Sequence, residues 1–267
     1  MPTNGTLIDK KAKIIAGLKH KKMRDKNRLF VAEGLRLCET LVKSDFMPEF
    51  GLYTANFAQN KRSQTLLAQL TQRGAIMYET TEKVIAQAGE VETPQGIIVA
   101  VRQKPYTALN DLKNIVNPFF VVLDNVQDPG NVGTIIRTAD AAGANGVIAL
   151  KGTVDLFNGK TLRSAMGSHF HLPLAVGVSD GDLINFCAEN NLPLYATLLH
   201  RASRPYYDAD LSRGAIILGN EAAGVNRNLA EHSVPIHIPM PGRAESLNVA
   251  VAAAVIVFAA ARQRQNM

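Results

Sequence analysis

Polar side chains that could take part in chemistry gather in three loops of the C-terminal half. The first loop is LDNVQDPGNVGTIIRTADAAGA, where Asn131 begins a helical pattern and Arg137 interrupts its small and apolar residues. A Pro-Gly turn followed by a helix start accounts for Asn131 on its own. Arg137 on its own could be an ordinary surface residue, because the long apolar stem of an arginine lets its guanidinium reach solvent.

The other two loops also combine a turn with an unusual polar residue. Glu221 lies between Gly219 and Gly224 at the end of an apolar strand, which indicates a tight turn where backbone approaches a ligand. A plain turn is the alternative interpretation. Ser246 fits a helix cap, whereas Asn248 opens a long apolar helix and requires a hydrogen-bond partner or a solvent-facing position.

These loops follow apolar runs that predict an α/β fold. FFVVLD, GVIAL, LPLAV, LPLYATLL, GAIILG and VPIHIPM alternate with helical segments, which predicts a parallel sheet with helices on both faces. Ligands of such sheets bind beyond the carboxyl ends of strands, where all three loops lie. The chain has no GxGxxG or GxxxxGK[ST] motif, which argues against dinucleotide enzymes and P-loop NTPases.

The N-terminal part predicts a separate domain. Short strands such as RLFVAEG and GIIVAV alternate with helical segments, which favours an α/β/α unit of about 100 residues. The polar, proline-containing segment RQKPYTALNDLKNIVNP follows it and predicts the boundary. We therefore expect one domain over residues 1–104 and a second over residues 105–267.

Charge favours a polyanionic partner. The net charge is +6 and the pI is near 9.3. Nine Lys and Arg residues stand between Lys10 and Arg28, against the single acid Asp25. This run is either a solvated helix face or a phosphate-contacting surface. The candidate RNA-binding residues within it are Lys19, Lys21, Lys22, Arg24 and Arg28.

Cysteine use and hydropathy narrow the class further. Cys38 and Cys187 form no CxxC pair and no zinc-type cluster, so we expect no metal and a reducing cytoplasm. The N-terminus lacks the apolar core of a signal peptide. The run Leu247–Ala261 has about fifteen residues, short of the roughly 20 that span a bilayer, and predicts a buried helix and no membrane association.

The three loops together resemble a known family. DNVQDPGNVGTIIRTADAAG, ILGNEAAGV and IPMPGRAESLNVAVAAAV resemble, in order, motifs one, two and three of the SpoU, or TrmH-like, RNA ribose 2′-O-methyltransferases across residues 119–264. SAMGSHFHLPL resembles the stretch between motifs one and two. KHKKMRDKNRLFVAEGLRL and ETPQGIIVAV resemble the ribosomal-protein-L30e-like domain that precedes the catalytic domain in many members.

The resemblance implies a fold, a cofactor and partners. It implies a deep trefoil knot in the C-terminal sheet, a homodimer, and S-adenosylmethionine bound through the knot loops. Its cofactor-binding residues would be Leu198, Gly219, Ile238, Met240 and Leu247. The substrate would be an RNA ribose 2′-hydroxyl, in rRNA by analogy with members that carry the extra domain. A tRNA substrate, a non-catalytic rRNA-binding assembly factor and a nucleotide-dependent oxidoreductase are the alternatives.

The resemblance also implies a catalytic set. Its members are Asn131, Arg137, Glu221, Ser246 and Asn248. The family is proposed to activate the hydroxyl with the arginine that Arg137 matches. Because an arginine stays protonated in ordinary sites, we favour Arg137 as an oriented cation that stabilises the developing alkoxide. We expect Asn131 to position Arg137, Ser246 and Asn248 to orient substrate and loop, and Glu221 to hold backbone amides or Arg137.

Overall fold

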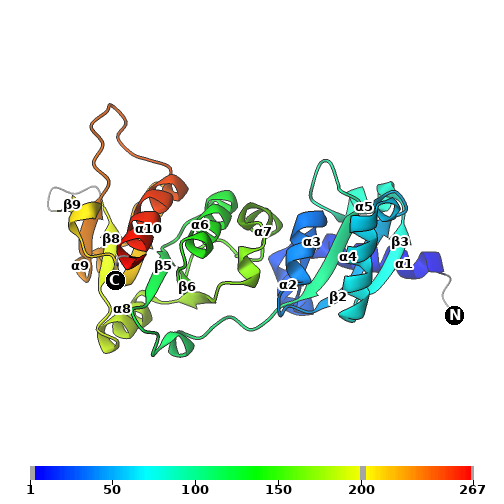
Figure 1. The fold of residues 1–267 in the computed structure, drawn as a ribbon, viewed down its shortest axis with the longest axis horizontal. Helices are drawn as coiled ribbons and strands as arrows, with labels where there is room; N and C mark the ends of the chain where they lie inside the picture. Colours follow the sequence, from blue (N-terminus) through cyan, green and yellow to red (C-terminus); the bar gives the residue numbers. More distant parts are fainter. Residues whose placement is uncertain (1–3, 199–202, 266–267) are drawn as a thin grey trace. The chain divides into compact units, whose positions relative to one another are not determined.

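The computed structural model describes residues 4–198 and 203–265 in two compact units (Figure 1). The first unit holds residues 1–105 together with Phe157–Phe170, and the second holds the remainder of the chain. The excursion of Phe157–Phe170 has a packing reason. The Phe157 ring lies 4.7 Å from that of Phe30, and the Phe170 ring lies 5.2 Å from that of Phe46, centroid to centroid. The expected domain ranges did not place this segment in the N-terminal unit.

The N-terminal unit is built on a four-stranded sheet of order β1-β4-β2-β3, in which β2 and β3 are parallel and the other pairs antiparallel. Its elements are α1 (Asn4–Gly17), α2 (Lys21–Asn27), β1 (Leu29–Glu33), α3 (Leu35–Leu41), β2 (Pro48–Thr54), η1 (Phe57–Gln59), α4 (Lys61–Gln72), β3 (Ile76–Thr80), α5 (Glu82–Ala88), β4 (Ile97–Arg102), α7 (Gly159–Ala165) and η3 (Ser168–Phe170).

Successive side chains of β4 point to opposite faces of the sheet and pack against different helices. Ile97, Val99 and Val101 pack with side chains of α3, α4 and α7, whereas Ile98 and Ala100 pack with side chains of α1 and α5. The sheet therefore lies between two helical layers, which gives the predicted α/β/α arrangement.

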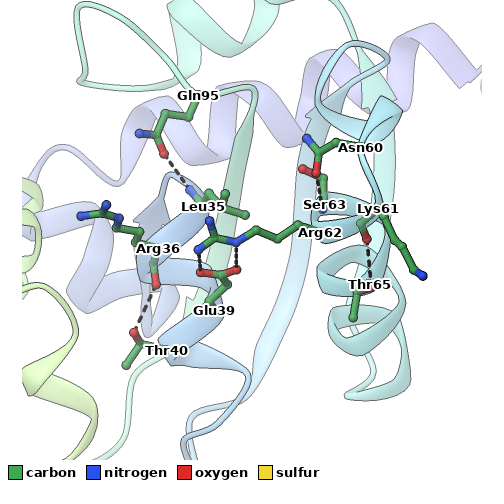
Figure 2. Close-up of polar contacts among 10 residues, drawn as sticks. All are labelled: Leu35, Arg36, Glu39, Thr40, Asn60, Lys61, Arg62, Ser63, Thr65 and Gln95. Carbon is green, nitrogen blue, oxygen red and sulfur yellow. Dashed lines mark hydrogen bonds and ion pairs between the residues drawn. The ribbon is translucent and has the colours of Figure 1, made fainter.

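An exposed ion pair connects α3 and α4. Figure 2 shows Arg62, at the start of α4, donating to both carboxylate oxygens of Glu39 on α3, at 2.6 and 2.7 Å. Asn60 caps α4 by accepting from the Ser63 N–H, and Gln95 accepts from the Leu35 N–H at the start of α3. These bonds hold helix ends and loops of the N-terminal unit together.

The C-terminal unit is built on a seven-stranded, all-parallel sheet of order β7-β6-β5-β10-β8-β11-β9. Its elements are η2 (Leu109–Leu112), β5 (Phe119–Leu123), α6 (Pro129–Ala141), β6 (Gly146–Leu150), β7 (Leu174–Val178), α8 (Asp180–Glu189), β8 (Leu194–Thr197), β9 (Arg204–Pro205), η4 (Tyr206–Asp208), β10 (Gly214–Leu218), α9 (Arg227–Glu231), β11 (Val234–His237) and α10 (Val249–Gln265).

Helices cover both faces of this sheet, as the sequence predicted. Phe120, Val122 and Ile217 pack with side chains of α8 and α9. The alternate positions of β5 and β10 face α6 and α10, which pack on each other and on these central strands (Figure 1). The central strands are buried along their whole length, which explains their continuous apolar sequences.

Helix α10 differs from the prediction of a buried helix. One face is buried through Ala253, Ile256 and Val257, but Val251 and Phe258 are 50% and 51% exposed. The sequence misleads here because residues on both faces are apolar, so no polar stripe marks the exposed side. Across the described ranges, no helix combines the length and apolar character needed to cross a bilayer.

Candidate active site

A cleft of about 760 Å³ lies beyond the carboxyl ends of β8, β10 and β11. Its walls come from the ends of these strands, the loops after β10 and β11, and the first turns of α10. The five residues predicted to bind the cofactor all line it: Leu198, Gly219, Ile238, Met240 and Leu247. The residues named for a cofactor site thus share one cavity.

The loop after β10 is a tight turn closed on itself. Asn220 and Gly224 exchange backbone hydrogen bonds of 3.0 and 2.9 Å, and the Asn220 side chain accepts from the N–H groups of Ala222 and Ala223. A Cβ atom on Gly219 would lie 2.3 Å from the carbonyl carbon of Gly224, so backbone packs directly on backbone there. This close approach is the reason for glycine at position 219.

Three predicted catalytic side chains are joined in a hydrogen-bonded chain. Asn248 Nδ2 donates to Asn131 Oδ1 at 3.0 Å, and Asn131 Nδ2 donates to Glu221 Oε1 at 3.0 Å. The direction is fixed at the start, because Asn248 Oδ1 caps α10 by accepting from the Ala250 and Val251 N–H groups. These hydrogen bonds link the first turn of α6 to the loops after β10 and β11, which are far apart in sequence.

Glu221 ends this chain as an acceptor. Its carboxylate also accepts, at 3.4 Å each, from the N–H groups of Gln127 and Asp128, just before α6. Burial alone would raise the pKa of Glu221, but the hydrogen bonds from Asn131, from its own backbone N–H and from these two amides together outweigh it and hold the pKa below its ordinary value. The Glu221 carboxylate therefore accepts from two backbone amides, a geometry compatible with one of its two expected roles.

Arg137 and Ser246 stand outside this chain. Ser246 is exposed and lines the cleft. Arg137 is exposed on α6, and its side chain makes no hydrogen bond or ion pair with any residue that the structure describes. No hydrogen bond joins Asn131 to Arg137 in the described residues, so the expected positioning of Arg137 by Asn131 has no direct contact behind it; the Asn131 amide bonds Glu221 and Asn248.

Asn220 and Asp124 are polar residues of the site that were not named from the sequence. The Asn220 side chain braces its own loop and donates to the Asn125 carbonyl at 2.9 Å. The Asp124 carboxylate, 5% exposed, accepts from the Asn226 N–H at 2.6 Å. Burial raises the pKa of Asp124, and this hydrogen bond opposes the rise. The available signal was their position, since each is the polar residue that ends or follows a buried parallel strand.

The candidate RNA-binding residues lie in and around α2 of the N-terminal unit. Lys21, Lys22 and Arg28 are exposed, and Lys19 is half-buried. Arg24 differs from them and is a correction to the prediction. It is 2% exposed, and its guanidinium donates to the carbonyls of Leu18 and Lys19 at 2.7 and 2.8 Å. Arg24 therefore holds the turn between α1 and α2 and presents no free charge to RNA.

The cysteines and metal-ligating residues form no further site in the described ranges. Cys38 and Cys187 are free and buried, and burial raises the pKa of both thiols. Within residues 4–198 and 203–265, no group of three or more His, Cys, Asp and Glu side chains is placed to hold a metal ion.

The chain belongs to the SpoU rRNA methylase family. The family model matches residues 118–258, and the model of the MRM3-like substrate binding domain matches residues 9–99. The predicted family and the predicted enzyme class, an RNA methyltransferase, are therefore confirmed.

Individual relatives agree with this assignment over most of their length. The 23S rRNA (guanosine(2553)-2′-O)-methyltransferase RlmP of Bacillus subtilis is 39% identical over 240 residues, covering 89% of this chain and 90% of the relative. The 23S rRNA (guanosine-2′-O-)-methyltransferase RlmB of Escherichia coli is 30% identical, covering 77% and 87%. An AdoMet-bound rRNA methyltransferase from Sinorhizobium meliloti has a TM-score of 0.84 at 36% identity, with 94% of each chain covered. AviRb from Streptomyces viridochromogenes, with AdoMet, has a TM-score of 0.86 at 27% identity, covering 96% and 98%.

Proposed function

We propose that this enzyme transfers a methyl group from S-adenosylmethionine to a ribose 2′-hydroxyl of large-subunit rRNA. The observation that carries the proposal is the cleft, where the predicted cofactor residues meet the Asn248–Asn131–Glu221 chain. The printed activities of the relatives from B. subtilis and E. coli support the ribose hydroxyl and the large-subunit rRNA as the target.

The lining of the cleft suits this cofactor. A neutral adenine ring suits a wall of apolar side chains. The cleft provides such a wall at Leu198, Ile238, Met240 and Leu247. Among its described lining residues there is no Lys or Arg, which disfavours a phosphate-bearing cofactor and suits a sulfonium cation. When bound, S-adenosylmethionine supplies an electrophilic methyl group.

Arg137 carries the charge-stabilising role in this proposal. A guanidinium keeps its proton, so it stabilises negative charge on the 2′-oxygen without acting as a base. It also suits the adjacent RNA phosphate, which together with water offers a route for the departing proton. Because its side chain has no hydrogen-bond or ion-pair partner among the described residues, its donors are available for RNA.

The remaining catalytic candidates position the loops. Glu221 is a poor proton acceptor, since its pKa is lowered and its oxygens already accept protein N–H groups. Asn131 and Asn248 hold the first and third loops together, and Ser246 faces the cleft where it can orient substrate.

In the same proposal the N-terminal unit contributes a phosphate-contacting surface. Because the buried Arg24 is excluded, the candidate phosphate-contacting residues are Lys19, Lys21, Lys22 and Arg28. Each phosphate that they neutralise releases counterions, so binding becomes salt-dependent.

A homodimer, a trefoil knot and a cytoplasmic location complete the proposal. The exposed apolar face of α10, with Val251 and Phe258 seven positions apart, supports a second copy of the chain as its occupant. A Phe258→Glu variant would shift the sedimentation coefficient to that of a monomer if this face is the interface. An unchanged coefficient would place the contact elsewhere.

Transfer of tritium from labelled S-adenosylmethionine to rRNA tests the function. We expect label in large-subunit rRNA that digestion releases as a 2′-O-methylated nucleoside. Label in tRNA alone would change the substrate. Absence of label in any RNA that the protein still binds would make it an assembly factor, and binding of NAD in calorimetry would favour an oxidoreductase.

A further inference from the structure

The charges around the cleft are uneven. Its described lining carries two carboxylates, Glu221 and Glu245, and one imidazole, His237, which contacts the Ser203 hydroxyl at 3.0 Å. No Lys or Arg side chain is among them. The fixed charge within the described lining is therefore negative.

The two carboxylates differ in what surrounds them. Glu221 accepts hydrogen bonds from Asn131 and from two backbone N–H groups, so protein donors already offset its charge. Glu245 is exposed, lines the cleft, and makes no hydrogen bond or ion pair with any described residue. Arg243, two positions earlier, is exposed too but does not line the cleft. Glu245 thus supplies the carboxylate that remains available to a ligand.

The substrate and product forms of the cofactor differ by one positive charge. S-adenosylmethionine carries a sulfonium cation, whereas S-adenosylhomocysteine has a neutral thioether and shares the adenosine and the amino-acid tail. We propose that Glu245 is a specificity-determining residue that makes the cleft favour the charged cofactor over its neutral product. This inference rests on the proposed function, because it takes S-adenosylmethionine as the cofactor.

Coulomb's law sets the size of the effect. Unit charges about 6–10 Å apart, at an effective dielectric of about 40–80, change an affinity roughly two- to tenfold. Because Glu245 is exposed, salt would reduce the effect as the Debye length falls from about 8 Å at 0.15 M to about 3 Å at 1 M. The consequence for turnover is weaker inhibition by the product.

Calorimetry on the full chain tests the inference with three ligands. They are S-adenosylmethionine, S-adenosylhomocysteine and sinefungin, an analogue that carries an ammonium group in place of the methylsulfonium. In Glu245→Gln we expect the Kd values of both cations to rise two- to tenfold at low salt while that of S-adenosylhomocysteine stays within twofold. In the control Arg243→Gln, preference for the cations should not fall.

Three outcomes would overturn the inference. Equal weakening of all three ligands would mean that Glu245 contacts a part that they share. Unchanged affinities would mean that its charge does not reach the cofactor. If wild-type protein binds none of the three, the proposed function itself fails, and that result is distinguishable because it precedes any substitution.

Discussion

The polar contacts of the two units differ in what they join. In the N-terminal unit, Arg62 and Glu39 are 23 positions apart and form an exposed ion pair between two helices. In the C-terminal unit, Asn248, Asn131 and Glu221 join loops 117 and 90 positions apart, and backbone N–H groups fix both ends of the chain. Exposed pairs contribute little stability, whereas a chain anchored on backbone fixes where its side chains stand. The Arg62–Glu39 pair is therefore a surface contact with little effect on the fold, whereas the Asn248–Asn131–Glu221 hydrogen bonds set the geometry of the site.

The largest effect expected from breaking the anchored chain comes from Asn131→Asp. The new carboxylate replaces a donor with an oxygen facing Glu221 Oε1, so the two loops repel each other. We expect kcat for methyl transfer to fall about a hundredfold, roughly 2.7 kcal/mol, with the protein still folded. Single-turnover kinetics and circular dichroism measure the two quantities. A rate within threefold of wild type would show that the chain is incidental.

The basic surface of the N-terminal unit should give the next largest effect. Replacing Lys19, Lys21 and Lys22 with Ala should weaken RNA binding about tenfold or more at low salt and reduce the slope of log K against log salt by about 1–3. Fluorescence anisotropy over a salt series provides the measurement. An unchanged slope would return these residues to an ordinary solvated helix face.

Two arginines of the N-terminal unit sharpen the contrast between buried and exposed contacts. Arg24→Ala leaves two carbonyls without their donor in a buried turn and should lower the free energy of unfolding by about 1–3 kcal/mol. Arg62→Ala removes an exposed ion pair and should lower it by about 0–1 kcal/mol. Urea titrations compare them, and equal losses would contradict our assignment of Arg24 to the scaffold.

The smallest effect expected is in the pH dependence of stability at Glu221. A folded-state pKa below the unfolded value means that ionised Glu221 stabilises the fold above the unfolded pKa, and that this contribution is lost as pH falls through the folded pKa. The stability difference between wild type and Glu221→Gln should therefore be constant near pH 7 and shrink below about pH 4.5, the ordinary value. Urea midpoints between pH 3 and 7 record it. A difference that grows on acidification would reverse the sign of the shift.

Much of the architecture could be predicted from the sequence because burial leaves a clear pattern. Continuous apolar runs marked β5 and β10 as central parallel strands, and the loop containing Gly219 and Glu221 was predicted as a tight turn because of its glycines. Apolar runs and glycines are local features of the sequence, so they predict strands and turns, which depend mainly on neighbouring residues.

The hydrogen-bond partners of polar side chains could not be predicted from the sequence because the tertiary structure determines them. Asn248 was expected to need a hydrogen-bond partner or a solvent-facing position, but nothing in the sequence pointed to Asn131, 117 positions away. Arg24 and Lys22 look alike in a basic run, yet only the fold shows that Arg24 is turned inward onto two carbonyls. The packing of Phe157–Phe170 with the N-terminal unit was missed for the same reason, since an apolar side chain does not name its neighbour.

We propose that Arg137 acts on RNA and leaves cofactor binding to other residues. The most direct measurement pairs methyl transfer to rRNA with calorimetry of S-adenosylmethionine, in wild type and in Arg137→Ala. We predict that transfer falls at least about a hundredfold, while cofactor affinity stays within about a factor of ten, roughly 1.4 kcal/mol. Loss of cofactor binding in a folded Arg137→Ala protein, or transfer at the wild-type rate, would show that Arg137 does not have this role.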